Sequence, residues 1–178
     1  MVQQLCPPCH SAAPLENVMI EPGRLTDRHE GSLVVFLIGM RINHFLRPRQ
    51  WLPVARSMGP MIAELEDNPE SGFIGAETLL AGMRTVLLVQ YWRDFARLEA
   101  YAQDRDRNHW PAWSAFNKAV GDNGSVGIFH ETYCVPAGGF ETISVNMPPF
   151  GLARFSGRQP ATGSRVAARD RMSAMSEG

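Results

Sequence analysis

Strand-like patterns dominate the hydrophobic positions of the chain. Residues 33–42 are continuously apolar and rich in branched side chains, which is typical of a central strand covered on both faces. Four further segments carry strand patterns bounded by turn residues, at 73–80, 83–92, 126–135 and 140–146. The first two of these are separated by Ala81-Gly82, so we expect them to form a hairpin-like pair.

Helical patterns fill the intervals between these strands. Pro48 opens a segment whose apolar side chains recur three to four residues apart, which predicts a helix with one buried stripe. Asp94 has the position of an N-cap before a second helix with Phe95 and Leu98 facing inward. A third helix is predicted to begin near Asn108, and one of its faces carries His109, Trp113 and Phe116.

The order of these elements predicts the fold class. It is α+β with the ferredoxin-like plan β-α-β-β-α-β, in which the second crossover is split into two helices. The helices cover one face of such a sheet, and the sequence offers no second set of helices for the other face. We therefore expect a homodimer in which the sheets of two copies pack together as a dimeric α+β barrel.

Composition divides the 178 residues into three parts. Residues 1–30 are rich in proline, glycine and polar residues and show neither period, so they are predicted to form an N-terminal arm. Residues 31–152 carry the ferredoxin-like domain. Over 153–178 the chain turns to glycine, serine, alanine and arginine, which bury too little apolar surface to offset the ordering entropy, so this tail is predicted to be disordered.

Charge and hydropathy narrow the choice of partners. The formal net charge is −1, so no overall field attracts nucleic acid or an acidic membrane. The longest fully apolar run, 33–40, is far too short to span a bilayer, and the N-terminus lacks the basic start and apolar core of a signal peptide. Three cysteines, an odd number, argue against a disulfide framework. We expect a cytoplasmic protein whose partners are a small molecule and a second copy of itself.

Two histidines are the candidate chemical groups. His109 lies on the apolar stripe of the third helix, and His130 alternates along its strand with Val126 and Ile128. If that face of the strand meets the helices, both imidazoles point into the same space. Neutral imidazole is well suited to ligate iron, and a second imidazole can act as acid or base near neutral pH. The alternative is that both are hydrogen-bonded core histidines.

Arg41 stands near the end of the first apolar strand. A buried guanidinium needs an anionic partner, because an unpaired buried charge is strongly destabilising. Glu131, Glu77 or the carboxylate of a substrate or cofactor would supply that partner.

Six segments, taken together, resemble one known family. Three lie in the first part of the chain: VFLIGMRIN at 35–43, WLPV at 51–54 and LLVQYWR at 87–93. Three follow later: HWPAWSAFN at 109–117, HETY at 130–133 and VNMPPFGL at 145–152. They resemble the family that includes the fumagillin-pathway monooxygenase of fungi, over about residues 34–152.

The resemblance implies a dimeric α+β barrel and an oxygenase of small apolar metabolites. It leaves the cofactor open. Antibiotic-biosynthesis monooxygenases of this fold work without metal or flavin, whereas the aldoxime dehydratases bind haem between sheet and helices. The latter use a proximal histidine on a helix and a distal histidine on the next strand, an order that His109 and His130 share.

The leading hypothesis is a haem-binding monooxygenase that acts on a small apolar metabolite with molecular oxygen. His109 would be the axial ligand of haem b, with Trp113 and Phe116 beside the macrocycle. His130 would stand on the distal side as a catalytic group. Arg41 would pair with a haem propionate or with the substrate, and Tyr133 is a further catalytic candidate.

Three alternatives stay open from the sequence. In a cofactor-independent monooxygenase, His130, Tyr133 and Asn146 would orient a phenolic or enolic substrate. A haem-dependent lyase of the aldoxime-dehydratase type would turn over without oxygen. A non-catalytic binding protein would hold a small molecule and release it unchanged.

Overall fold

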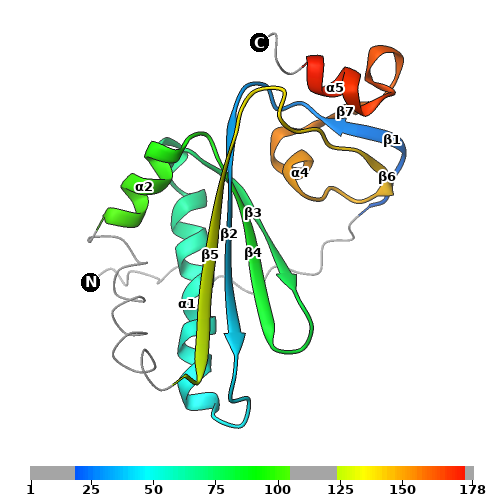
Figure 1. Cartoon of the computed structure of the whole chain (residues 1–178). Coiled ribbons are helices and arrows are strands. Elements are labelled where there is room, and N and C mark those ends of the chain that lie inside the picture. Colours follow the sequence, from blue (N-terminus) through cyan, green and yellow to red (C-terminus); the bar gives the residue numbers. More distant parts are fainter. Residues whose placement is uncertain (1–18, 105–123, 175–178) are drawn as a thin grey trace, which may run out of the picture.

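A four-stranded antiparallel sheet forms the centre of the molecule in a computed structural model that describes residues 19–104 and 124–174 (Figure 1). The strands lie in the order β3-β4-β2-β5. Their bounds are Phe73–Leu80 for β3, Thr85–Trp92 for β4, Leu33–Ile42 for β2 and Val126–Val135 for β5. The predictions for 33–42, 73–80 and 126–135 are confirmed in full, and the strand predicted from residue 83 begins at Thr85.

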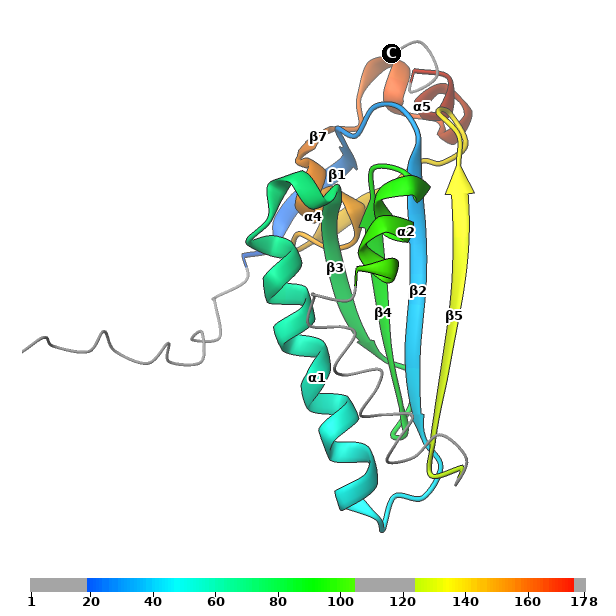
Figure 2. The ribbon, with the colours of Figure 1, turned by 90° about the vertical axis from the view of Figure 1, so that its left-hand side faces the viewer.

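Two described helices lie on one side of this sheet, as the side view shows (Figure 2). They are α1, Pro48–Glu66, and α2, Phe95–Gln103. Asp94 is the N-cap of α2, and its Oδ1 accepts the backbone N–H of Arg97 at 2.8 Å. With β2-α1-β3-β4-α2-β5 in chain order, the predicted α+β ferredoxin-like fold is confirmed. The third predicted helix, near Asn108, lies outside the described residues.

Strand register decides which side chains meet the helices. Val34 of β2 lies opposite Trp92 of β4, and every second residue from there faces the helices. Trp92 is fully buried and packs in one apolar cluster with Val34, Leu65 and Leu98. Met40 belongs to a second cluster farther along the sheet, with Ile42 and Val126. The core therefore lies between the sheet and the helices.

The opposite face of the sheet, here called the open face, is covered only in part by the described residues. Helix α4, Leu152–Ser156, lies over one end of it, where the Phe155 ring takes the space that a Cβ at Gly75 would need. Glu77 of β3 is buried there, accepts the backbone N–H of Gly151 at 3.1 Å and pairs with Arg154 at 3.3 Å. These contacts hold α4 against the sheet.

A second, smaller sheet lies beside α4 and corrects the predicted arm and tail (Figure 1). Its order is β6-β1-β7, with β6 at Ser144–Met147, β1 at Glu21–Asp27 and β7 at Arg158–Pro160. It is followed by α5, Ala168–Ala174, and two short 3-10 helices lie at Pro69–Ser71 and Gly163–Arg165. The expectation of an arm is therefore wrong for residues 21–27, and that of a disordered tail is wrong for residues 153–174.

Buried polar side chains explain why composition did not predict the ordered structure of residues 21–27 and 153–174. Asp27 is fully buried, and its carboxylate accepts the Thr142 hydroxyl at 2.6 Å across 115 positions of sequence. Arg171 is also buried and pairs with Glu141 at 2.6 Å. Hydrophobic periodicity gives no sign of such pairs, because the stabilising groups are charged or polar and far apart in sequence.

None of the helices in the described part of the chain is long and apolar enough to cross a membrane.

Candidate functional site

A cavity of about 380 Å³ lies between α1 and the helix-facing side of the sheet. Its walls are mainly methionine, isoleucine, valine, leucine and alanine side chains. From α1 they come from Val54, Ala55, Met58, Gly59, Ile62, Ala63 and Glu66; from the sheet they come from Ile38, Gly39, Met40, Thr78, Val86, Leu88 and Ile128. A concave apolar space with few polar groups is the usual form of a small-molecule site.

The α1 wall was predicted as solid core rather than as a cavity wall. The predicted stripe includes Val54, Met58 and Ile62, which do face the sheet. Gly59 and Ala63 also line the cavity, and their small size leaves space that larger side chains would fill. The signal that points to a cavity is therefore the presence of small residues within an otherwise bulky stripe.

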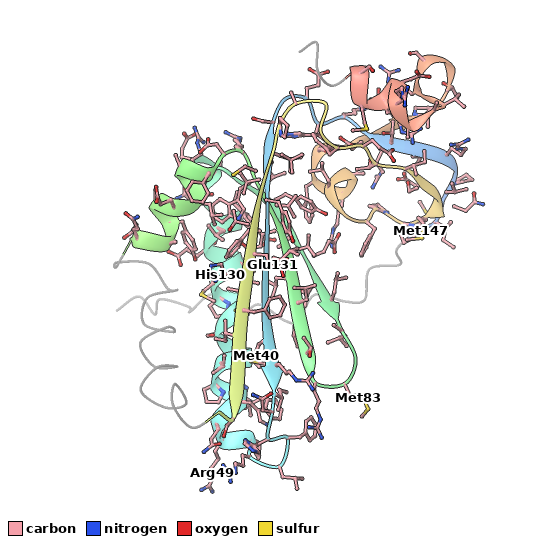
Figure 3. All side chains as sticks on the ribbon, in the orientation of Figure 1. Met40, Arg49, Met83, His130, Glu131 and Met147 are labelled. Atoms are coloured by element: carbon pink, nitrogen blue, oxygen red, sulfur yellow. The ribbon has the colours of Figure 1, made fainter. Side chains whose placement is uncertain are left out.

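His130 lies on the helix-facing side of β5, as predicted. It is opposite Ile38 of β2, and its ring lies 5.7 Å from the ring of Phe36. Ile128, two positions earlier on the same face, lines the cavity. The imidazole is exposed and is not one of the residues that line the cavity (Figure 3).

Arg41 and Tyr133 lie on the open face, on the side of the sheet opposite to His130. Arg41 alternates with Met40, which is in the core, and its Nη1 donates to the Thr85 hydroxyl at 3.3 Å. Tyr133 is opposite Val35 and half-exposed. The three predicted catalytic residues are therefore not brought together within one chain, because neighbours separated by an odd number of positions in a strand point to opposite faces.

Glu131 and Tyr133 form a pair on the open face of β5. The phenol donates a short hydrogen bond to Oε2 of Glu131. This hydrogen bond, together with the negative charge of Glu131, raises the pKa of Tyr133 above its ordinary value of 10.0. The pair therefore keeps its proton into alkaline solution.

Replacing Glu131 by glutamine is expected to lower the Tyr133 pKa back toward 10.0, because the amide carries no charge. Since the folded-state pKa is the raised one, the pair stabilises the fold below pH 10.0, and this contribution is lost as the pH rises through the raised pKa. The measurement is a spectrophotometric phenolate titration, with Tyr133→Phe identifying the signal among the three tyrosines. An unchanged titration in Glu131→Gln would contradict the pairing.

Asn146 is also separated from His130. It lies in β6 of the small sheet with φ of 51°, and its Oδ1 accepts the backbone N–H of Gly23 at 2.9 Å. A non-glycine residue in this left-handed region is often Asn, because its short polar side chain hydrogen-bonds nearby backbone. Asn146 thus shapes the edge of the small sheet. His109, Trp113 and Phe116 lie outside the described residues.

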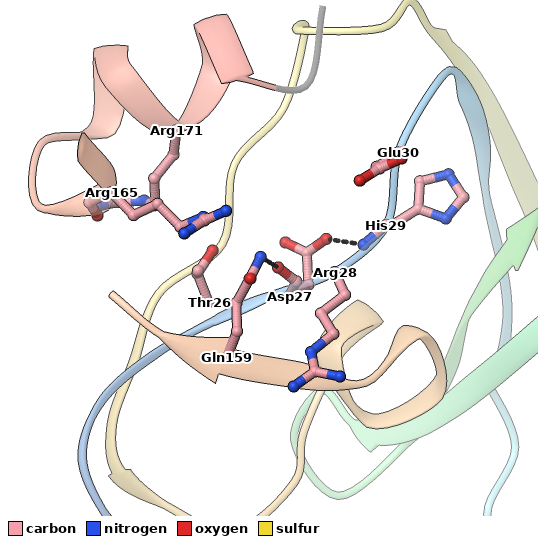
Figure 4. A pocket seen from close by; sticks show the side chains of 8 residues that line it. All are labelled: Thr26, Asp27, Arg28, His29, Glu30, Gln159, Arg165 and Arg171. Carbon is pink, nitrogen blue, oxygen red and sulfur yellow. Dashed lines mark hydrogen bonds between the residues drawn. The ribbon is translucent and has the colours of Figure 1, made fainter. Parts of the chain in front are cut away.

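A second pocket, of about 50 Å³, lies between β1 and the C-terminal segment (Figure 4). Its charged walls are largely committed to one another: Asp27 accepts the backbone N–H of His29 at 2.8 Å, and Gln159 donates to the Asp27 carbonyl at 3.0 Å. Arg171 donates to the carbonyls of Arg165 and Val166. This pocket organises the small sheet, so the apolar cavity is the better candidate site.

The fold and the cavity define a ferredoxin-like α+β protein with an apolar site between sheet and helices. Residues 33–152 match the family described as Monooxygenase af470-like, and the chain belongs to that family. Monooxygenase af470 of Aspergillus fumigatus is 28% identical over 143 residues, which are 75% of this chain and 48% of that protein. The chain therefore spans about half the length of this curated relative.

One solved structure has a similar fold at low sequence identity, and another resembles the chain more weakly. An aldoxime dehydratase in complex with butyraldoxime is 14% identical, with a TM-score of 0.57 over 96% of this chain and 47% of that chain. SnoaB, a cofactor-independent oxygenase from Streptomyces nogalater, is 12% identical, with a TM-score of 0.43 over 57% of this chain and 91% of that chain. At these identities the likeness concerns the fold alone.

Proposed function

We propose that the chain is a monooxygenase-type oxidoreductase that binds a small apolar metabolite between α1 and the sheet. The observation that carries this proposal is the apolar cavity of about 380 Å³ on the face that also bears His130. Membership in the Monooxygenase af470-like family supports the reaction class and the proposal of molecular oxygen as the second substrate.

In this proposal the cavity walls would bind the substrate, and the His130 imidazole would orient its reacting end. Methionine and branched side chains bind an apolar molecule through removal of its surface from water, at about 25 cal/mol per Å². Apolar walls alone orient a bound molecule only weakly. A polar group at the margin of the cavity therefore has to fix the reacting end of the molecule. His130 is suited to that role because imidazole exchanges a proton near neutral pH. It would hold or accept the proton of a substrate hydroxyl or enol.

Haem is the cofactor that the order of His109 and His130 favours. The apolar walls and an exposed imidazole on the helix-facing side fit one side of a macrocycle. Arg41 does not fit as a propionate partner in this space, because it lies on the open face. His109 would supply the nitrogen that holds the iron, and Trp113 and Phe116 would give the group apolar contacts. Bound haem would supply redox-active iron for oxygen chemistry.

Titration of the purified full chain with hemin tests this cofactor. We expect a sharp Soret band that saturates at one haem per chain and is lost in His109→Ala, because the axial nitrogen is removed. Arg41→Ala is the matched control and should keep the band, since its side chain lies on the other face. A hemin titration without a defined band would reject haem and leave the oxygenase proposal to be tested on haem-free protein.

Three rival functions are separated by turnover conditions and by the fate of the ligand. Aerobic product formation by haem-free protein would identify a cofactor-independent oxygenase, in which His130 alone of the three predicted orienting residues faces the cavity side. Turnover of an aldoxime without oxygen would identify the dehydratase-type lyase. A ligand that binds tightly and is released unchanged would identify a binding protein.

We also propose that a second copy covers the open face. Phe129 and Tyr133 of β5 stay exposed there, and the Phe129 ring lies across Gly39, where a Cβ would come within 2.3 Å of it. Burial of such aromatic side chains is a common source of association energy. A homodimer would place Arg41 and Tyr133 inside the barrel between the two sheets.

A further inference from the structure

Apolar side chains protrude from two neighbouring loops at the end of the sheet where α1 begins. The β2–α1 loop, 43–47, carries Phe45 and Leu46, which are 48% and 94% exposed. The β3–β4 hairpin carries Leu80 and Met83, which are 78% and 94% exposed. We call this group of loops and side chains the basal end. Single exposed apolar residues are common on protein surfaces, but a cluster at loop tips is not.

The two loops are tied to each other and to α1. The backbone N–H of Ile42 donates to the Arg84 carbonyl at 2.7 Å, and Nη1 of Arg84 donates to the Asn43 carbonyl at 3.4 Å. Trp51 in the first turns of α1 donates from Nε1 to the Phe45 carbonyl at 3.0 Å and stacks on the Phe45 ring at 5.7 Å. The apolar tips are therefore presented by an ordered support.

Several arginines lie near these tips. Exposed arginines in this region are Arg47, Arg49, Arg56 and Arg84. The chain has no aspartate or glutamate between residues 31 and 63 or between 78 and 93. In the described part of the chain none of these arginines forms an ion pair, and the first turn of α1 holds no acidic residue, so its positive helix end adds to the field.

We propose that the basal end docks on the surface of an anionic membrane. Leu46 and Met83 would enter the boundary between headgroups and acyl chains, and the arginines would face the lipid phosphates. An interfacial protein needs this combination, because apolar insertion and attraction to anionic lipids are each weak alone. The net charge of −1 for the whole chain gives no sign of this local positive charge, because acidic residues elsewhere in the sequence offset the arginines of the basal end.

Other occupants fit the basal end less well. A second copy related by two-fold symmetry would set arginines against arginines, which is unfavourable without an acid between them. A nucleic acid would satisfy the arginines but leave Leu46 and Met83 exposed to water. Membrane docking satisfies both groups.

Vesicle flotation of the full chain tests the proposal. The probes are vesicles of phosphatidylcholine alone and vesicles in which a quarter of the lipid is phosphatidylserine. We expect the protein to float with the anionic vesicles only, and added salt to weaken the binding. The triple variant Arg47→Gln/Arg49→Gln/Arg84→Gln should bind on the order of 100-fold more weakly, at about fivefold for each charge removed.

Two double variants separate insertion from simple charge attraction. Leu46→Ser/Met83→Ser keeps all arginines and should also lose binding, by on the order of tenfold or more, because buried methylene groups are lost. Val166→Ser/Arg169→Gln, on the exposed C-terminal segment, is the matched control and should bind as the wild type. Absence of flotation with anionic vesicles, or equal binding by all variants, would overturn the proposal. The proposal would also be overturned if the basal variants changed the oligomeric state of the protein. It would be overturned as well if the wild type bound RNA as strongly as anionic vesicles and the basal variants lost that binding.

Discussion

Trp92→Ala is expected to lower the free energy of unfolding by about 3–5 kcal/mol, the usual cost of removing a large core aromatic. Trp92 is 0% exposed and packs with Val34, Leu65 and Leu98. Its ring lies 5.3 Å from that of Phe73 and 5.7 Å from that of Tyr101. No neighbouring side chain can collapse into a space of this size without opening another. Urea unfolding followed by circular dichroism measures the change.

Two further variants show what the loss consists of. In the wild type, the indole Nε1 of Trp92 donates to Oε1 of buried Gln90 at 3.0 Å. Trp92→Phe keeps most of the packing but removes this donor, and it should lower the free energy of unfolding by about 1–3 kcal/mol. Glu99→Ala on the exposed side of α2 should stay within about 0.5 kcal/mol of the wild type. A cost below about 1 kcal/mol for Trp92→Ala would show that this cluster is not the core.

The hydrophobic pattern was sufficient to predict the main sheet because its central strands, β2 and β4, bury most of one face. Residues 33–42 and 126–135 have the predicted bounds, and the two strands pair along their full length. A shift by one residue would move every core side chain to the open face, so register and pattern have to agree. Asp94 was predictable for a similar reason, since a cap is a local interaction over three residues.

The small sheet was not predictable by the same route. Its strands are short, and β1 pairs with segments more than 100 positions away. Asp27 and Arg171, which would be expected at the surface, are instead buried with Thr142 and Glu141 as partners. A pattern of apolar residues cannot encode a stabilising contact whose two halves are polar and distant in sequence.

The candidate site was predictable in part. Alternation along β5 placed His130 on the helix-facing side, which the structure bears out. Arg41 was predicted to pair with a haem propionate or the substrate, but it lies on the open face. The run 33–42 is apolar on both faces, so alternation gave no sign of which face Arg41 occupies. The cavity itself depends on where α1 stands relative to the sheet, and a helix position in space is set by packing that no single segment contains.

Ala63→Trp is expected to abolish ligand binding in the cavity while leaving the fold intact. Ala63 lines the cavity from α1, and its side chain is exposed, so an indole can turn into the open space without displacing core atoms. The neutral apolar dye Nile red is a suitable probe, because its fluorescence rises in apolar surroundings. We expect at least tenfold weaker dye binding, about 1.4 kcal/mol, with the free energy of unfolding changed by less than about 1.5 kcal/mol.

Arg56→Trp is the matched control for this variant. Arg56 is exposed on the same helix and does not line the cavity, so the same indole there should leave dye binding within about twofold of the wild type. Equal loss in both variants would mean that tryptophan disturbs α1 as a whole. Full binding in both would place the ligand elsewhere and remove the observation on which the proposed function depends. Loss in Ala63→Trp alone locates the ligand between α1 and the sheet, on the face that bears His130.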